Sequence, residues 1–176
     1  MPNNTVQLIK AETENIPLIA KLANTIWHQH YPAIISMEQI NYMLNLMYSD
    51  ESLKEQMTIK GHDFYLIQQN SNNIGFIAVS KIAEVEKGYF IHKFYLDQTL
   101  AGKGTGTLAH NELVKLLDPS QLSLTVNRQN YKSINFYFKN GFKIESVADF
   151  DIGNGYVMND FVMVQIVQSP LANRTI

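Results

Sequence analysis

The feature that most constrains this chain is a glycine-rich turn between a predicted strand and a predicted helix. The turn reads Ala101-Gly102-Lys103-Gly104-Thr105-Gly106-Thr107. Glycine permits positive φ and close approach of a ligand, so successive backbone N–H groups can converge on one anion. The N-terminus of the following helix adds unpaired N–H groups and the positive end of its dipole. The turn therefore predicts a phosphate-binding site.

Three kinds of phosphate-binding loop compete for this pattern. A P-loop requires G-x-x-x-x-G-K-[ST], and it fails because Gly104 follows Lys103. The dinucleotide fingerprint G-x-G-x-x-G requires glycine at position 107, where Thr107 stands. The third candidate is the pyrophosphate loop Q/R-x-x-G-x-G/A of coenzyme A-dependent acyltransferases. A flexible turn without a ligand stays open as an alternative.

Hydrophobic periodicity predicts a mixed α/β fold for the rest of the chain. We expect the order β-ααα-βββ-α-β-α-ββ, with Thr13 and Ser36 as N-caps of the first two helices. The expected strand at 89–96 places Phe90, His92, Phe94 and Leu96 on one face and Tyr89, Ile91, Lys93 and Tyr95 on the other. The chain has 176 residues, of which 45% are hydrophobic, so we expect residues 1–176 to form a single domain with its own core.

Composition excludes several classes of function. Fourteen Lys+Arg against sixteen Asp+Glu give a net charge of −2, which argues against nucleic-acid binding through a basic face. The absence of cysteine excludes disulfides, cysteine nucleophiles and thiolate metal sites.

His28 and His30 are two residues apart on a predicted helix end and do not share a face, so we expect no metal. With no signal-peptide pattern at residues 1–10 and no long apolar stretch, we expect a cytoplasmic protein without membrane association.

A second motif follows a later predicted strand. The pattern N-x-x-[AS]-x-x-[FL]-Y-x-K-x-G-F is matched at every defined position by Asn130-Tyr131-Lys132-Ser133-Ile134-Asn135-Phe136-Tyr137-Phe138-Lys139-Asn140-Gly141-Phe142. With this motif and the glycine turn in the right order, the chain resembles the GNAT superfamily of N-acetyltransferases over residues 6–167, and in particular those that act on polyamines. One departure is Ala101, which stands where the family's loop begins with Gln or Arg.

The resemblance implies a mixed, mostly antiparallel central sheet flanked by helices, and acetyl-CoA as cosubstrate. It implies that Gly102, Lys103, Gly104, Thr105, Gly106 and Thr107 hold the pyrophosphate, with Asn130, Ser133 and Tyr137 lining the cofactor. Phe94, Tyr95 and Leu96 would pair with the pantetheine arm like an added strand. The implied activity is transfer of an acetyl group to a primary amine of a polyamine-like or amino-acid-like small molecule, by direct attack in a ternary complex.

Roles for individual groups follow from the same resemblance. Tyr137 would be the general acid that protonates the departing thiolate, although a packed aromatic is the alternative. The backbone N–H of Leu96 would stabilise the oxyanion. His92, or a water chain, would take the proton of the amine, and a half-buried strand histidine is the alternative. The acceptor would contact Trp27, His28 and Tyr31, unless Trp27 and Tyr31 belong to the core.

Three further alternatives remain open on the sequence. One is an acyl-CoA-binding sensor of the same fold without catalysis, and another is a module that binds ATP or NAD through the glycine turn. The carboxylates at Asp149-Asp151 and Asn159-Asp160 flank the last expected hairpin; they would attract a cationic amine such as a polyamine, or would simply be solvated turn residues. Two copies could pair through the C-terminal strands, although no residue pattern requires a homodimer.

Overall fold

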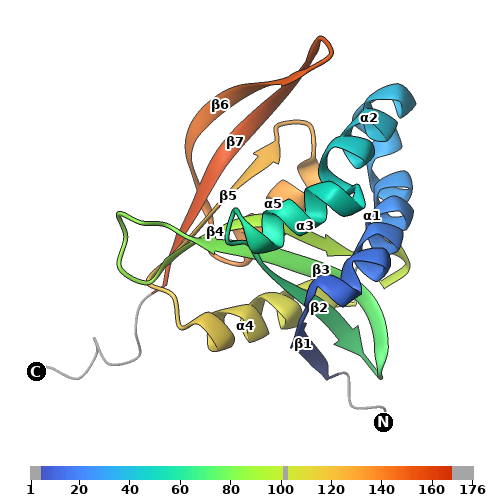
Figure 1. Ribbon diagram of the computed structural model, residues 1–176. Helices are drawn as coiled ribbons and strands as arrows, with labels where there is room; N and C mark the ends of the chain where they lie inside the picture. Colours follow the sequence, from blue (N-terminus) through green and yellow to red (C-terminus); the bar gives the residue numbers. More distant parts are fainter. Residues whose placement is uncertain (1–4, 101–102, 168–176) are drawn as a thin grey trace, which may run out of the picture. The chain divides into compact units, whose positions relative to one another are not determined.

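The computed structural model describes residues 5–100 and 103–167 (Figure 1). Its helices and strands follow the predicted order. They are β1 (Val6–Lys10), α1 (Ile16–His30), α2 (Met37–Tyr48), α3 (Asp50–Thr58), β2 (Asp63–Gln69), β3 (Asn72–Lys81), β4 (Gly88–Leu96), α4 (Thr105–Leu117), β5 (Gln121–Asn127), α5 (Tyr131–Lys139), β6 (Lys143–Gly153) and β7 (Tyr156–Ile166). Short 3-10 turns lie at Thr13–Asn15, Tyr31–Ala33 and Gln98–Leu100.

The strands form one mixed sheet flanked by helices, as predicted. Its seven strands are ordered β1-β2-β3-β4-β5-β7-β6. β1 and β2, β2 and β3, β5 and β7, and β6 and β7 pair antiparallel. β4 and β5 pair in parallel, in a register that runs from Gly88↔Gln121 to Ile91↔Leu124.

Residues divide into two compact units, of which the first comprises 1–80 and 92–113. Helices α1, α2 and α3 pack on one another in this unit (Figure 1). Each helix presents apolar residues at helical spacing, and this stripe is the part that is buried. Side chains with at most 1% exposure make up its core: Ile19, Ala23 and Ile26 of α1, Ile40 of α2, Leu53 of α3, and Phe64, Ile67, Phe76 and Ile77 of β2 and β3.

The second unit comprises residues 81–91 and 114–176. Its core is formed by Leu122 and Leu124 of β5, Phe142 and Met163, all at most 2% exposed. β6 and β7 form a long hairpin, which Figure 1 shows in orange and red. The single-domain organisation of the whole chain stays a prediction.

Local signals set most element ends, with one error. Ser36 caps α2 as predicted, because its Oγ accepts a hydrogen bond from the backbone N–H of Gln39 at 3.1 Å. Thr13 does not cap α1: it begins a 3-10 turn, and the residue that precedes α1 is Asn15. The final strands extend to the turn at Gly153, which adopts φ +85°. Backbone pairing in this hairpin continues where exposed polar residues interrupt the apolar alternation.

Candidate active site

The glycine turn leads directly into the N-terminus of α4, in the first unit. α4 begins at Thr105, and the carbonyl of Gly104 accepts a hydrogen bond from the N–H of Leu108 at 3.1 Å. Gly104 has φ +75°, a conformation that favours glycine over residues with a Cβ. Ala101 and Gly102, which open the turn, lie outside the described residues.

Thr105 gives this turn an unpaired polar group. The residue is 1% exposed, and its Oγ1 is buried with no hydrogen-bond partner among the described residues. Lys103 and Gly104 are exposed beside it, followed by Gly106 and Thr107 in the first turn of the helix. A free hydroxyl together with the open N–H groups of a helix terminus suits a phosphate oxygen. These residues therefore fit the predicted pyrophosphate site.

The end of β4, also in the first unit, is held close against β3. A Cβ built on Gly75 would lie 2.1 Å from the carbonyl oxygen of Tyr95, so only glycine fits there. The N–H of Asp97 donates to the carbonyl of Ile74 at 2.8 Å, and the carbonyl of Leu96 accepts from Nε2 of Gln98 at 2.8 Å. The predicted pantetheine strand, Phe94–Leu96, is half-buried. Its course is thus set by Gly75, a residue that sequence reasoning did not select.

Two of the three predicted acceptor contacts are part of an aromatic cluster in the first unit. Trp27 is 1% exposed, with its ring centroid 4.3 Å from that of Tyr31 and 5.9 Å from that of Tyr95. The hydroxyls of Tyr31 and Tyr95 lie 3.5 Å apart. Burial raises the pKa of neighbouring Tyr48 above its ordinary value of 10. This cluster brings Tyr31 together with the predicted pantetheine strand, and Trp27 packs beneath it.

The third predicted contact, His28, is an exposed residue of α1. Its Nδ1 lies 2.7 Å from the carbonyl oxygen of Asn24, one turn earlier. The structure therefore separates His28 from the cluster that holds Trp27 and Tyr31. Among residues 5–100 and 103–167, no group of three histidine or carboxylate side chains is arranged to hold a metal ion.

His92 lies on β4 in contact with a second histidine. Its ring stacks on that of His62, with centroids 3.8 Å apart and an interplanar angle of 16°. Nε2 of His92 lies 2.7 Å from Oγ of Ser80. Desolvation and the charges of His62 and Lys93 lower the pKa of His92 from 6.5 to about 3. The ring is therefore neutral at pH 7, as a base must be, but it is a weaker base than an exposed histidine.

Lys93, the next residue, was not selected by sequence reasoning. It is 7% exposed, and its Nζ lies 5.4 Å from the ring centroid of Tyr48 and 5.7 Å from that of Phe64. Burial, with a smaller contribution from the charge of Lys60, lowers the pKa of Lys93 from 10.5 to about 8. The available signal was its position between Ile91 and Tyr95 on one strand face, which is otherwise apolar or aromatic.

The second motif forms helix α5 in the second unit. Oδ1 of Asn130 accepts a hydrogen bond from the N–H of Ser133 at 3.2 Å, so Asn130 is the N-cap of α5. Tyr137 is 8% exposed, with its ring centroid 5.3 Å from those of Phe136 and Phe142. The carbonyl of Tyr137 accepts from the N–H of Phe142 at 3.0 Å. The motif thus builds a capped, tightly closed helix around a largely buried tyrosine.

Two carboxylates of the final hairpin have partners within the chain. Asp149 forms an ion pair with Arg128, with Oδ1 2.6 Å from Nη2, and Oδ1 of Asp151 accepts from the N–H of Gly153 at 2.9 Å. Both lie in strand β6 rather than in the turn. Asp160 of β7 differs from them, because it is 6% exposed and its Oδ1 has no hydrogen-bond partner among the described residues. The structure holds no helix long and apolar enough to cross a bilayer within the part of the chain it describes.

Comparisons with known proteins extend these observations. A model of the acetyltransferase (GNAT) family matches residues 27–142. A spermidine N(1)-acetyltransferase of Thermoplasma acidophilum is 26% identical over 154 residues, which cover 84% of this chain and 94% of that protein. The crystal structure of the PaiA N-acetyltransferase from T. acidophilum, in complex with coenzyme A, superposes with a TM-score of 0.75 at 27% identity and covers 93% of this chain and 99% of its own. A GCN5-related N-acetyltransferase from Rhodopseudomonas palustris shares the fold, with a TM-score of 0.76 at 16% identity over 95% of this chain and 99% of its own.

Proposed function

This chain belongs to the GNAT acetyltransferase family, and we propose that it transfers an acetyl group to a primary amine of a small, polyamine-like molecule. It is an N-acetyltransferase with acetyl-CoA as its cosubstrate. The observation that carries the acceptor class is the similarity to a spermidine N(1)-acetyltransferase along 84% of this chain. The sensor and nucleotide-module alternatives have no comparable support.

The pyrophosphate of acetyl-CoA is proposed to bind at the start of α4. Support comes from the unpaired Oγ1 of Thr105, the positive φ of Gly104 and the N–H groups of Gly106 and Thr107 in the first helical turn. Lys103 is exposed there and adds a positive charge. Because backbone groups supply most of these donors, we expect Ala101, which replaces the family's Gln or Arg, to weaken binding of the cosubstrate and not to abolish it.

The pantetheine arm is proposed to pair with Phe94–Leu96. The parallel ladder between β4 and β5 covers only residues up to Ile91 of β4, so it does not use the backbone of Phe94–Leu96. Close approach at Gly75 holds this segment against β3. In the second unit, Asn130 and Ser133 are assigned to the same cosubstrate because they are the defined positions of the second motif.

Acetyl-CoA supplies an activated acetyl group as a thioester. The protein's groups are proposed to stabilise the developing negative charge and to transfer protons. The N–H of Leu96 donates to the oxygen on which negative charge develops as the amine attacks. The hydroxyl of Tyr137 donates its proton to the departing sulfur. The amine loses its proton to His92 or, through a water chain, to solvent. The half-exposed ring of His92 is neutral at pH 7, as a proton acceptor must be.

A thiol-release assay tests the proposed function. Purified protein is incubated with acetyl-CoA and, separately, with spermidine, spermine, amino acids, aminoglycosides and peptides, and free coenzyme A is measured. We expect release above the hydrolysis background with at least one polyamine, and N-acetylated product by mass spectrometry. Binding of acetyl-CoA without release for any acceptor would instead establish the sensor alternative. Release with amino acids or aminoglycosides alone would reject the polyamine class.

A homodimer through the C-terminal strands stays a prediction. β6 is an edge strand of the sheet, and Ile144, Val147 and Phe150 on it are exposed. Edge strands with exposed apolar residues favour pairing with another chain. Light scattering coupled to size exclusion measures the mass directly, and a monomer at micromolar concentration would reject the dimer.

A further inference from the structure

A pocket of about 470 Å³ lies in the first unit, beside the end of α2, helix α3 and strand β4. The polar side chains that matter for its chemistry are Glu51, Glu55, Gln56, Lys60, His62 and Lys93. Except for Lys60 and Glu55, these groups make no ion pair with one another. The pocket therefore combines buried and exposed polar groups, of which only Glu55 and Lys60 form an ion pair with each other.

Lys93 provides a positive charge without a counter-charge. The side chain is 7% exposed, and within the described residues it forms no ion pair or hydrogen bond. Its Nζ lies over the faces of Tyr48 and Phe64. A buried ammonium group is costly unless it is paired, and proteins normally supply a carboxylate. Glu51 and Glu55 line the same pocket, but within the described residues neither forms an ion pair with Lys93, so a ligand carboxylate could supply the missing counter-charge.

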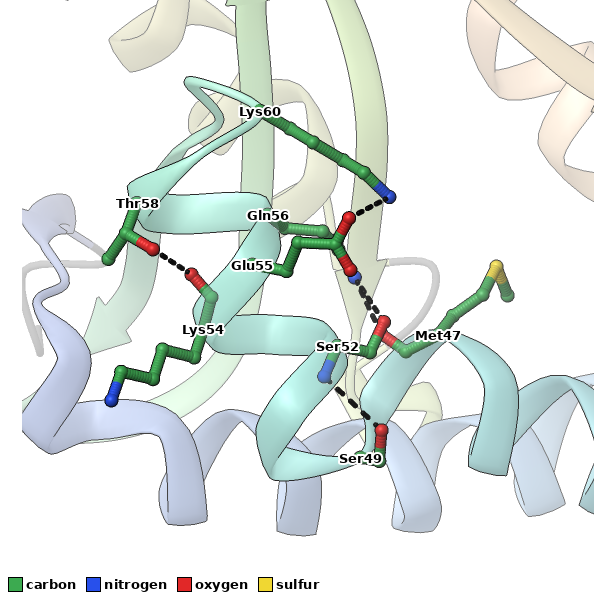
Figure 2. A network of polar contacts seen from close by, with 8 residues as sticks. All are labelled: Met47, Ser49, Ser52, Lys54, Glu55, Gln56, Thr58 and Lys60. Carbon is green, nitrogen blue, oxygen red and sulfur yellow. Dashed lines mark hydrogen bonds and ion pairs between the residues drawn. The ribbon is translucent and has the colours of Figure 1, made fainter.

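Gln56 and His62 leave two further buried atoms unpaired. Nε2 of Gln56 donates to the carbonyl of Met47 at 2.8 Å and to Oγ of Ser52 at 3.1 Å, as Figure 2 shows. Because a carbonyl can only accept, this arrangement fixes the amide orientation. It leaves Oε1 of Gln56 buried without a donor among the described residues. Nδ1 of His62 is unpaired in the same way. Oε1 of Gln56, an acceptor, and Nδ1 of His62 can therefore each form a hydrogen bond with a ligand.

Carboxylates add the opposite charge. Glu55 forms an ion pair with Lys60, with Oε1 3.3 Å from Nζ, and both are exposed (Figure 2). Glu51, one turn earlier on α3, is exposed and has no ion pair within the described residues. With the Glu55–Lys60 pair neutral, the pocket presents one buried positive charge at Lys93 and one accessible negative charge at Glu51.

We propose that this pocket binds a small zwitterion, an amino acid whose carboxylate pairs with Lys93 and whose amine is held by Glu51 and Oε1 of Gln56. A ring N–H of His62 donates a second hydrogen bond to the carboxylate. The inference goes beyond the proposed acetyl transfer because it concerns binding alone and requires no acetyl-CoA. Its ligand has one group of each charge, unlike a polyamine, which carries positive charge alone.

Isothermal titration without acetyl-CoA tests the inference with three probes of equal carbon number. These are 4-aminobutyrate, a zwitterion, succinate, which lacks the amine, and putrescine, which lacks the carboxylate; glycine adds a shorter zwitterion. We expect at least one zwitterion to bind, succinate to bind more weakly and putrescine not to bind. Lys93→Met keeps the length of the side chain and removes its charge, so it should weaken the zwitterion about 30-fold or more.

Matched variants separate this site from general effects. Lys54 is an exposed lysine of helix α3, and its side chain does not line the pocket. Lys54→Met should therefore leave the affinity for the zwitterion unchanged. Glu51→Gln should weaken the zwitterion and leave succinate unchanged. Carbon-detected titration of the lysine Cε should show the pKa of Lys93 rising on binding. Failure of every zwitterion to bind, equal affinity of wild type and Lys93→Met, or binding of putrescine as tight as that of 4-aminobutyrate would overturn the inference.

Discussion

Removing the buried charge of Lys93 should make the protein more stable at neutral pH. Burial lowers the pKa of Lys93 from 10.5 to about 8, so the folded state binds a proton less tightly than the unfolded state. This difference of about 2.5 units corresponds to about 3 kcal/mol of lost free energy of unfolding at pH 7, at about 1.4 kcal/mol per unit. Lys93→Met removes this penalty and keeps an unbranched side chain against the rings of Tyr48 and Phe64.

The gain should be smaller than the full penalty because a contact is lost as well. The Nζ of Lys93 lies over both rings, and a cation–π contact contributes about 0.5–2 kcal/mol. We therefore expect Lys93→Met to raise the free energy of unfolding by about 1–3 kcal/mol. For a chain of this length, each kcal/mol raises Tm by about 2–4 °C.

The pH dependence is the sharper measurement. The unfolded state holds the proton up to pH 10.5, whereas the folded state releases it near pH 8. The free energy of unfolding of the wild type therefore rises with pH across that window. The charge-dependent advantage of Lys93→Met should fall from about 3 kcal/mol at pH 7 to about 2 at pH 9 and about 0.4 at pH 10.5.

Urea unfolding at these three pH values measures the effect, with the exposed Lys54→Met as control. If the difference in free energy of unfolding between Lys93→Met and the wild type does not change between pH 7 and 10.5, the reasoning is refuted, because the difference would then not depend on proton binding. Destabilisation at pH 7 would refute it as well.

Three other perturbations test separate parts of the structure. Tyr137→Phe should lower kcat by about 10²-fold or more and leave binding of acetyl-CoA unchanged, as measured by thiol release and titration; an unchanged kcat removes the general-acid role. Gly75→Ala would place a Cβ 2.1 Å from the carbonyl oxygen of Tyr95, so it should destabilise the fold by more than about 2 kcal/mol, and a Tm equal to that of the wild type would contradict this. The pKa values of His62 and His92 are lowered to about 4 and about 3, so the free energy of unfolding should fall as the pH drops from 6.5 towards 4. In urea titrations, His92→Phe should reduce the slope of this free energy against pH. A variant with the wild-type slope would argue against this role of His92.

Sequence reasoning succeeded where structure depends on neighbours along the chain. The order of helices and strands followed from periods of 3.6 and 2. Ser36 caps its helix, as predicted, through a residue three positions later. The error at Thr13 is of the same local kind: a 3-10 turn is inserted before α1, and propensity does not distinguish such a turn from the first helical turn.

The candidate site divides along the same line. The glycine turn and the motif that contains Tyr137 were recognisable because their spacing is local. The pKa of His92 could not be predicted in this way, because it is set by burial and by the charges of His62, thirty residues away in sequence, and of Lys93. An alternation pattern places His92 on a strand face, but it does not show which ring will cover it.

The sequence by itself determined the order of elements and the family, and it predicted an anion site at the turn before α4. Only the tertiary structure decided that Lys93 is buried without a carboxylate, that Gln56 and His62 share a pocket with it, and that Gly75 admits no side chain. The physical reason is that φ preferences, caps and periodicity act between residues a few positions apart. Desolvation, pairing of charges and close backbone approach depend on segments that only folding brings together.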